Sequence, residues 1–280
     1  MSAESVVTLA PRARAGRGPI RRRAMRRTAL RVLATQLALL ALLLGLWEWA
    51  TRTGAASAFL YGSPSAIAAD LVASLRDGSL LRDMAITGAE TLAGFALGNL
   101  IGTAIGLVLW YSRFASRVMQ PFILGLGSIP IVALAPIAII WFGTGYASKV
   151  AMATLSVVVV SIVIAYKGAA GVDPDQANLM RSLGAGRNQI FRYLVVPASL
   201  TDIFAGLKLT VGFALVGAIV GEFMSSSAGL GHAIFKAGSL YAIAKVFAEL
   251  VATILLALVL SSAVVRVERL LLPWRHDLAP

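Results

Sequence analysis

Six long apolar runs constrain this chain more than any other feature of its sequence. They cover residues 32–50, 85–111, 118–142, 150–166, 198–224 and 246–265, and each is close to or above the roughly 20 residues that a helix needs to cross a bilayer. The chain is 58% hydrophobic and only 14% charged, whereas about a quarter of the residues of a soluble domain are charged. The sequence therefore predicts an all-α polytopic membrane protein with about six transmembrane helices.

The residues between and around these runs divide the chain into segments. Residues 1–31 form a basic N-terminal tail with nine arginines, which we expect to lie against anionic lipid headgroups. Residues 32–84 hold the first span and an external amphipathic helix, which Ser63 caps and Pro64 begins. Residues 85–270 hold the other spans, and residues 271–280 form a second tail. Because 19 of the 25 Lys and Arg residues fall on one side of this arrangement, both termini are predicted to be cytoplasmic.

The second run carries a stripe of glycines on one helical face. They recur at intervals of four residues, which places them one above another: Gly94, Gly98, Gly102 and Gly106. Small residues at this spacing allow a neighbouring helix to approach closely. We therefore predict tight helix packing along this face, although the sequence does not identify the neighbouring helix.

The longest polar interval between the runs is residues 173–197, which reads as a helix, a turn and a second helix. Asp173 is suited to cap the first helix and Pro174 to occupy its first position. Glycine tolerates backbone angles that end a helix, so the first helix is predicted to end at Gly184-Ala185-Gly186. The second helix carries one apolar stripe, formed by Ile190, Phe191, Leu194 and Val195. Two such helices between spans predict a docking element.

This interval resembles the EAA loop of ABC importer permeases, in which Glu-Ala-Ala is followed by a glycine and then by Ile-x-Leu-Pro. Gly184 stands for the glycine, and Pro197 lies at the matching distance behind Leu194 and Val196. Asn178-Leu179-Met180 replaces the Glu-Ala-Ala triplet. This departure leaves open what replaces the family's glutamate.

The flanking sequences, from Trp141-Phe142-Gly143 to Gly229-Leu230-Gly231, resemble the branch that imports nitrate, sulfonates, taurine and similar small solutes. The resemblance implies a type I importer permease fold in the bacterial inner membrane, with residues 85–270 as permease core and 173–197 as coupling loop. It implies a second permease copy, most simply in a homodimer, cytoplasmic ABC ATPase subunits and an external solute-binding protein as partners. The ATPase-coupling residues that it implies are Asn178, Met180, Arg181, Leu183, Gly184, Ala185, Gly186, Phe191 and Pro197.

Two features of the spans concern the solute path that this resemblance implies. Pro121, Pro130 and Pro136 interrupt the third run, and proline removes helical hydrogen bonds. We predict a kinked span in which Pro130 and Pro136 line the path, with a bent structural helix as the alternative. Glu222, near the outer end of the fifth run, is predicted to lie at the outer rim of the path, with a local cap as the alternative. Glu90 is predicted to lie at the membrane interface rather than to act in transport.

The chain carries no recognisable catalytic or nucleotide-binding motif. None of its lysines is followed by Ser or Thr, which excludes a P-loop, and it has no cysteine. The sequence shows no metal-ligand cluster and no nucleophile–base pair. His232 is predicted to be exposed in an outward-facing loop over residues 225–241, and Lys245 and Glu249 are spaced for a weak surface pair. We therefore expect no enzyme activity and no cofactor in this chain, with ATP and Mg bound by the partner ATPase.

Two other functions remain open at this point. An ion-coupled secondary transporter would carry ionisable residues near the middle of its spans, and this chain has almost none there. A membrane-anchored assembly component would carry a sizeable soluble domain, which the pattern of runs does not provide. The net charge of +12 would suggest nucleic acid in a soluble protein. In a membrane protein it reflects Lys and Arg retained on the cytoplasmic side, so no nucleic-acid partner is expected.

Overall fold

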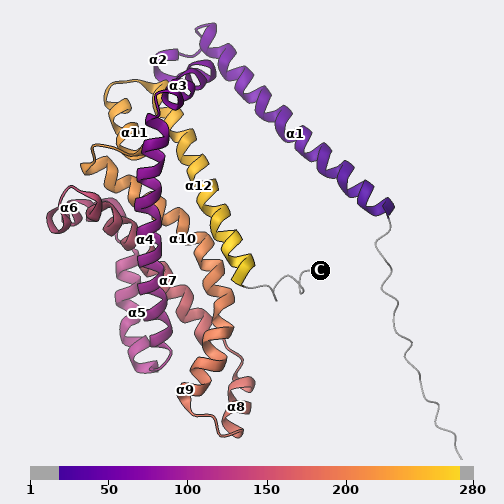
Figure 1. Cartoon of the computed structure of the whole chain (residues 1–280), viewed down its shortest axis with the longest axis vertical. Helices are drawn as coiled ribbons and strands as arrows, with labels where there is room; N and C mark the ends of the chain where they lie inside the picture. Colours follow the sequence, from indigo (N-terminus) through magenta and orange to yellow (C-terminus); the bar gives the residue numbers. More distant parts are fainter. Residues whose placement is uncertain (1–18, 272–280) are drawn as a thin grey trace, which may run out of the picture. The chain divides into compact units, whose positions relative to one another are not determined.

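The structure, a computed structural model, describes residues 19–271 and the side chains of residues 30–271. Within this part the chain forms helices and no strand, which confirms the predicted all-α class (Figure 1). In chain order the elements are α1 (Pro19–Arg52), α2 (Ala58–Tyr61), α3 (Pro64–Arg76), α4 (Ser79–Leu109), α5 (Arg113–Gly127), α6 (Ile131–Phe142), α7 (Tyr146–Ala170), α8 (Pro174–Ser182), α9 (Arg187–Ile190), the π-helix η1 (Phe191–Val195), α10 (Val196–Ser225), α11 (Leu230–Ser239) and α12 (Ile243–Leu271).

The chain divides into two compact units, residues 1–56 and residues 57–280. The first contains α1, whose apolar part, Leu30–Arg52, is long enough to cross a membrane. Its last two turns carry an ion pair between Glu48 and Arg52 at 2.6 Å. The second unit contains every other described helix.

Five helical segments of the described chain are long and apolar enough to cross a membrane. They lie in α1, α4, α7, α12 and the continuous stretch Arg187–Ser225. α5 and α6 pass the same test together, but they are bent by 94° at the break between them. The total of five, or six with the broken pair, agrees with the prediction of about six. The expected single kinked span is corrected to two helices, because α5 ends at Gly127 and α6 starts only after Pro130, which has no N–H to continue a helix.

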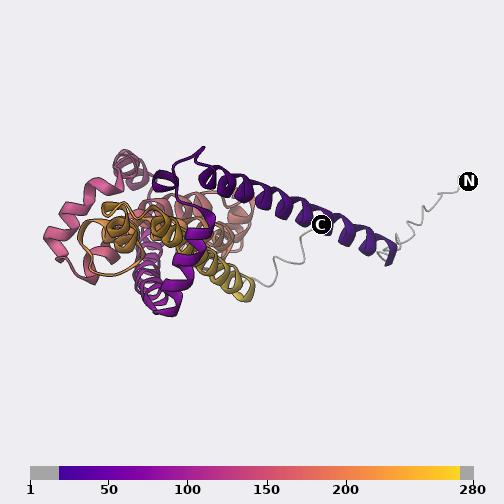
Figure 2. The ribbon, with the colours of Figure 1, turned by 90° about the horizontal axis from the view of Figure 1, so that it is seen from above.

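The centre of the second unit is formed by α4, α7 and α10, which pack against one another. Seen from above, the long helices of the second unit lie together, with α6 at their edge (Figure 2). The glycine stripe of α4 lies against α7. A Cβ atom added to Gly98 would lie 2.7 Å from Cβ of Val157, and one added to Gly102 would lie 2.5 Å from Cβ of Ser161. The two backbones therefore approach so closely that no side chain fits between them.

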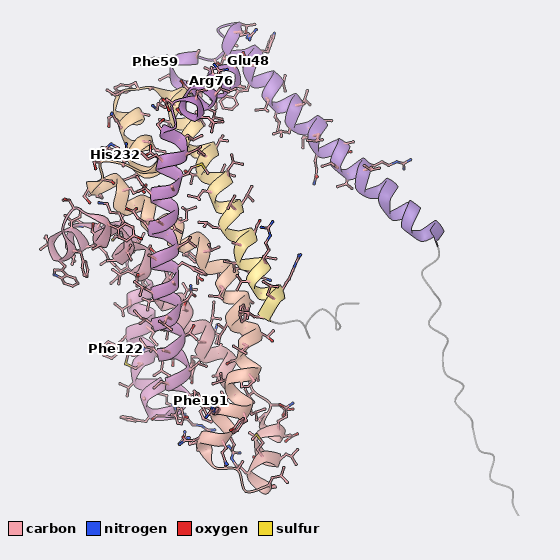
Figure 3. The ribbon with its side chains drawn as sticks, in the orientation of Figure 1. Glu48, Phe59, Arg76, Phe122, Phe191 and His232 are labelled. Carbon is pink, nitrogen blue, oxygen red and sulfur yellow. The ribbon has the colours of Figure 1, made fainter. Side chains whose placement is uncertain are left out.

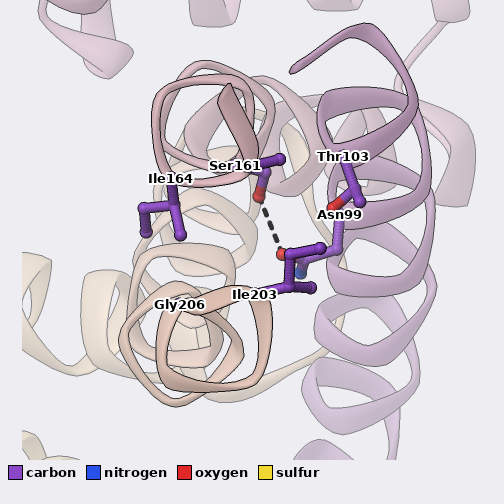
Figure 4. Close-up of a pocket in the computed structure, with 7 residues that line it drawn as sticks. Asn99, Thr103, Ser161, Ile164, Ile203 and Gly206 are labelled. Atoms are coloured by element: carbon purple, nitrogen blue, oxygen red, sulfur yellow. Dashed lines mark hydrogen bonds between the residues drawn. The ribbon is translucent and has the colours of Figure 1, made fainter. Parts of the chain in front are cut away.

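A polar contact ties these three helices together inside the bundle. The Asn99 Oδ1 atom of α4 accepts hydrogen bonds from Ser161 Oγ of α7 at 2.7 Å and from Thr210 Oγ1 of α10 at 3.1 Å. Its Nδ2 atom donates to the backbone oxygen of Phe95 at 2.8 Å. Figure 4 shows Asn99 and Ser161 pointing toward each other between apolar neighbours such as Ile164. Such a contact fixes the register of the helices because slippage would leave polar groups unpaired in an apolar region.

The second helix of the predicted docking element is continuous with the fifth span. α9, η1 and α10 run on as one stretch of 39 residues, Arg187–Ser225, whereas the sequence placed the start of the span at Ala198. Pro197 lies near the start of α10, and the turn before it widens so that the Val196 N–H bonds to the oxygen of Phe191. Because proline cannot donate a hydrogen bond, this π turn lets the helix continue past it.

The two ends of the bundle carry different short helices. α8 and α9 lie at one end of the long helices, and α11 lies at the other end with α2 and α3 (Figure 1). The predicted start of the amphipathic helix α3 is confirmed, since the Ser63 Oγ atom accepts from the Ala66 N–H at 3.3 Å. The predicted loop over residues 225–241 is corrected, because ten of its residues form α11.

Candidate functional site

The docking element predicted at residues 173–197 begins with a capped helix. The Asp173 side chain accepts from the backbone N–H of Asp175 at 2.9 Å, and Pro174 occupies the first helical position. An acidic cap accepts from one of the free N–H groups at a helix start, and a proline in the first position removes another because it has no N–H. The residues that start α8 therefore all come from its own local sequence.

A glycine turn ends α8. Gly184 has a φ of +85°, which is the left-handed region that glycine adopts without strain. Its N–H bonds to the Arg181 oxygen at 2.9 Å, and the Ala185 N–H bonds to the Met180 oxygen at 2.9 Å. These two bonds form a Schellman motif, which satisfies carbonyl groups that the end of a helix leaves free. The turn is therefore fixed by local hydrogen bonds. Gly186 follows as the cap of α9, with its N–H bonded to the Gln189 side chain at 2.7 Å.

The base of the element is an apolar and aromatic cluster. Ile190 and Val195 are buried there together with Ala169 of α7. The Phe191 ring lies 4.6 Å from the Tyr111 ring and 5.6 Å from the Trp110 ring, centroid to centroid. Further members of the cluster are Leu107, Val172, Ala177, Met180, Ala185 and Leu194. This packing attaches the docking element to the ends of α4 and α7.

Arg187 reinforces the same base. Its guanidinium group lies over the rings of Trp110 and Tyr111, at 5.6 and 5.5 Å from their centroids, and donates a hydrogen bond to the Tyr111 backbone oxygen. Cation–π contacts of this kind hold the side chain against the bundle. Arg187 therefore serves the element's own architecture, whereas Arg181 lies on the exposed face and donates to Asn178 Oδ1 at 2.6 Å.

The outer face of the element presents apolar side chains to solvent. Leu179 of α8 is 62% exposed. Leu183, the residue that caps the end of α8, is 79% exposed and lies four residues after Leu179. Met180, one of the coupling residues that the resemblance implies, packs into the base. The sequence reasoning did not select Leu179, although it lies one helical turn before Leu183. The outer face of the element therefore carries two exposed leucines.

Comparison with known proteins assigns the chain to a family. A family model described as "Binding-protein-dependent transport system inner membrane component" matches residues 98–273, which include the whole docking element. The chain belongs to this family. It is an importer permease subunit, the membrane component of a transporter and not an enzyme.

Curated relatives match most of this permease. It is 30% identical to the formylaminopyrimidine transport permease protein of Halalkalibacterium halodurans, over 84% of this chain and 93% of that protein. It is 29% identical to the putative aliphatic sulfonates transport permease protein of Bacillus subtilis, over 85% and 86%. It is 30% identical to the riboflavin transport system permease protein of Chloroflexus aurantiacus, over 84% and 88%.

A solved structure has the same fold. The match is a chain of the inward-facing MetNI methionine ABC transporter, with a TM-score of 0.62 and 20% sequence identity. It covers 69% of this chain and 96% of that chain. The likeness confirms the type I importer permease fold that the sequence predicted.

At the end of the permease opposite the docking element, buried side chains hold the start of α11. Glu222 is 0% exposed, and its carboxyl oxygens accept from Thr87 Oγ1 and from the Gly231 N–H, both at 2.6 Å. The Thr87 Oγ1 atom accepts in turn from the Leu230 N–H at 2.9 Å. Asp83 accepts from the N–H of Gly229 at 2.9 Å. Side chains of α4 and α10 thus bind the three successive N–H groups at this helix start.

Two further charged residues are buried beside Glu222. Lys149 donates to the backbone oxygens of Thr144 and Ser225, the latter at 2.7 Å. Glu90 is buried and interacts electrostatically with Glu222 and Lys149, and its Oε2 atom has no hydrogen-bond partner among the described residues. Glu90 lies inside the bundle, and α4 starts 11 residues earlier, at Ser79, which places Glu90 about 16 Å along the helix. Its position at the membrane interface stays a prediction.

The remaining predicted residues lie elsewhere in the permease. Pro130 and Pro136, at and inside α6, are exposed on this chain, while Ala135 and Ala138 of the same helix pack against Met152. A path role for these prolines and for Glu222 stays a prediction. The expected position of His232 is corrected, because it is half-buried in α11, near the end of the bundle opposite Phe191 (Figure 3).

Proposed function

We propose that this permease forms the membrane path of an ATP-driven importer for a small solute such as nitrate, a sulfonate, taurine or a related compound. The relatives named above are described as permeases for a formylaminopyrimidine, for aliphatic sulfonates and for riboflavin. These solutes differ in size and charge, so selectivity resides largely in an external solute-binding protein. ATP and Mg bind to separate cytoplasmic ATPase subunits, because this chain has no P-loop.

The observation that carries the proposal is the docking element with its two outward leucines. α8 is closed by local hydrogen bonds at Gly184 and attached to α4 and α7 through the aromatic base around Phe191. A coupling element needs both properties, because it must make different contacts in two states of the ATPase and pass the difference to the spans. Leu179 and Leu183 provide the contact surface.

The proposal also specifies orientation and assembly. The docking end of the bundle faces the cytoplasm together with both termini, and α11 faces outward. The Lys and Arg distribution supports this arrangement, because residues at the docking end, such as Arg113, Lys167 and Arg192, belong to the basic majority. Two copies of the permease enclose the path, most simply as a homodimer. The secondary-transporter alternative is weaker, because the buried ionisable groups Glu222 and Lys149 bond to backbone and hydroxyl groups that hold the ends of helices.

The test replaces one docking leucine and compares it with a leucine at the other end. Leu183→Asp should leave the permease folded, because the side chain is 79% exposed, but it should release the ATPase during purification and abolish uptake. Leu240→Asp is the matched control, since Leu240 is 69% exposed and follows α11. It should retain the ATPase. Equal ATPase retention and uptake in Leu183→Asp and wild type would remove this element from the coupling mechanism.

A further inference from the structure

A polar cavity opens at the end of the permease opposite the docking element. It has a volume of about 270 Å³ and is enclosed by the first turns of α4, by α11 and by the first turns of α12. At about 30 Å³ per water molecule, this space corresponds to about nine waters. That is smaller than the usual pocket for a drug-sized ligand and suits a molecule of amino-acid size.

The inner wall of this cavity carries a buried carboxylate. Glu249 of α12 is 2% exposed, and its Oε2 atom has no hydrogen-bond partner in the described part of the chain. Asp83, the other acidic residue of the wall, is already bonded to the Gly229 N–H. The predicted pair between Lys245 and Glu249 does not form among the described residues, whose ion pairs are Glu48–Arg52 and Lys208–Glu268. A buried carboxylate without a donor is costly unless something supplies one.

The cavity is acidic on the inside and basic at its exposed part. The acidic groups that act on Glu249 are Asp70, Asp77 and Asp83, and the basic one is Lys245. The three basic side chains that line the cavity are all exposed: Arg82, Lys236 and Lys245. A simple anion would be repelled by Glu249, and a simple cation would have to pass three positive charges. A small molecule with a positively charged hydrogen-bond donor and a negatively charged group complements both the acidic inner end and the basic exposed end of the cavity.

We propose that this cavity binds a small zwitterion, with its ammonium group on Glu249 and its acidic group toward Arg82, Lys236 and Lys245. Two sources carry this chemistry at a membrane surface. One is a free amino acid or aminosulfonate, and the other is the headgroup of phosphatidylethanolamine. The site depends on the proposed function only for the side of the membrane on which it opens. Neither the docking element nor ATP takes part in it.

Binding is measured on the full-length permease with its co-purifying subunits, without binding protein or nucleotide. Nanodiscs of phosphatidylcholine and phosphatidylglycerol are titrated calorimetrically with taurine. Isethionate, which has a hydroxyl in place of the amine, and ethanolamine, which lacks the acidic group, are the matched probes. Taurine should bind about tenfold or more tightly than either, since each probe lacks one charged hydrogen-bonding group.

Variants assign the two ends of the site. Glu249→Gln should weaken taurine binding about tenfold or more, while Glu48→Gln, a change in an exposed ion pair far along the chain, should leave it unchanged. Lys236→Ala alters an exposed residue of the cavity and should weaken taurine but not ethanolamine. The Lys236 variant keeps the test valid if Glu249→Gln fails to fold.

A second arm distinguishes the lipid source. In nanodiscs that also contain phosphatidylethanolamine, mass spectrometry should show this lipid retained by wild type and lost from Glu249→Gln if the headgroup is the occupant, with taurine then excluded. Either taurine binding or lipid retention that depends on Glu249 supports the site. The proposal is overturned if neither occurs, if taurine and isethionate bind equally, or if Glu249→Gln matches wild type. ATPase retention in Leu183→Asp reports on the proposed function separately.

Discussion

Adding one methyl group to Gly98 tests the packing on which the bundle depends. The Cβ atom of Gly98→Ala would lie 2.7 and 2.8 Å from Cβ and Cγ1 of Val157, and 2.9 Å from the Thr154 backbone oxygen. Carbon atoms in contact normally stay about 3.5–4.0 Å apart. Because one of the atoms met belongs to the backbone of α7, rotation of a side chain cannot relieve the contact, and α4 and α7 must separate.

The magnitude follows by comparison with a glycine that has open space. Overpacking costs about 1–3 kcal/mol, while replacing glycine by alanine inside a helix gains about 0.8–1.0 kcal/mol. Gly212 of α10 has no atom within 4 Å of an added Cβ, so Gly212→Ala should show the stability gain of alanine without an overpacking cost. The difference between the two variants isolates the overpacking cost. For a chain of this size it corresponds to an apparent Tm difference of roughly 2–10 °C.

The assay is thermal unfolding of both variants in the same detergent, followed by tryptophan fluorescence. Gly98→Ala should unfold below Gly212→Ala, and Gly98→Leu, which adds more atoms to the same contact, should unfold lower still. Tm values for Gly98→Ala and Gly212→Ala that agree within error would show that α4 and α7 are not in close contact, and the packing argument would have to be abandoned.

Three other changes probe contacts between helices. Asn99→Leu removes the polar contact among α4, α7 and α10, and should lower stability by about 0.6–1.7 kcal/mol per bond lost, measured by the same thermal assay. Glu222→Gln replaces one of the two accepting carboxyl oxygens at Thr87 and Gly231 by an amide NH2 group that cannot accept, so hydrogen exchange at the start of α11 should rise while exchange in α8 stays unchanged. Lys208→Met removes the ion pair between Lys208 Nζ and Glu268 Oε2 at 2.5 Å, and should cost about 1.5–3 kcal/mol, the usual contribution of a hydrogen bond to a charged group. The losses in Lys208→Met and Glu268→Gln should not add in the double variant, and additive losses would contradict the pairing.

Features set by neighbours along the chain were predictable from the sequence. The cap at Asp173, the turn at Gly184 and the start of α3 at Ser63 depend on hydrogen bonds that span a few residues. The number of spans was predictable for a related reason, since a helix that crosses the bilayer must be long and apolar regardless of its partners. The spacing of the glycines also revealed a face built for close contact.

Features set by contacts across the fold were decided by the tertiary structure. The sequence did not identify α7 as the helix in the glycine groove, and it gave no reason to join Asn99 to Ser161 and Thr210, which lie 62 and 111 residues away. It did not show that Glu90 is buried in the bundle, and it predicted a surface pair for Glu249, which is also buried. A residue's neighbours along the chain set its local conformation. Whether its charge is buried, paired or left facing a cavity depends on helices that are distant in sequence, and only their packing determines it.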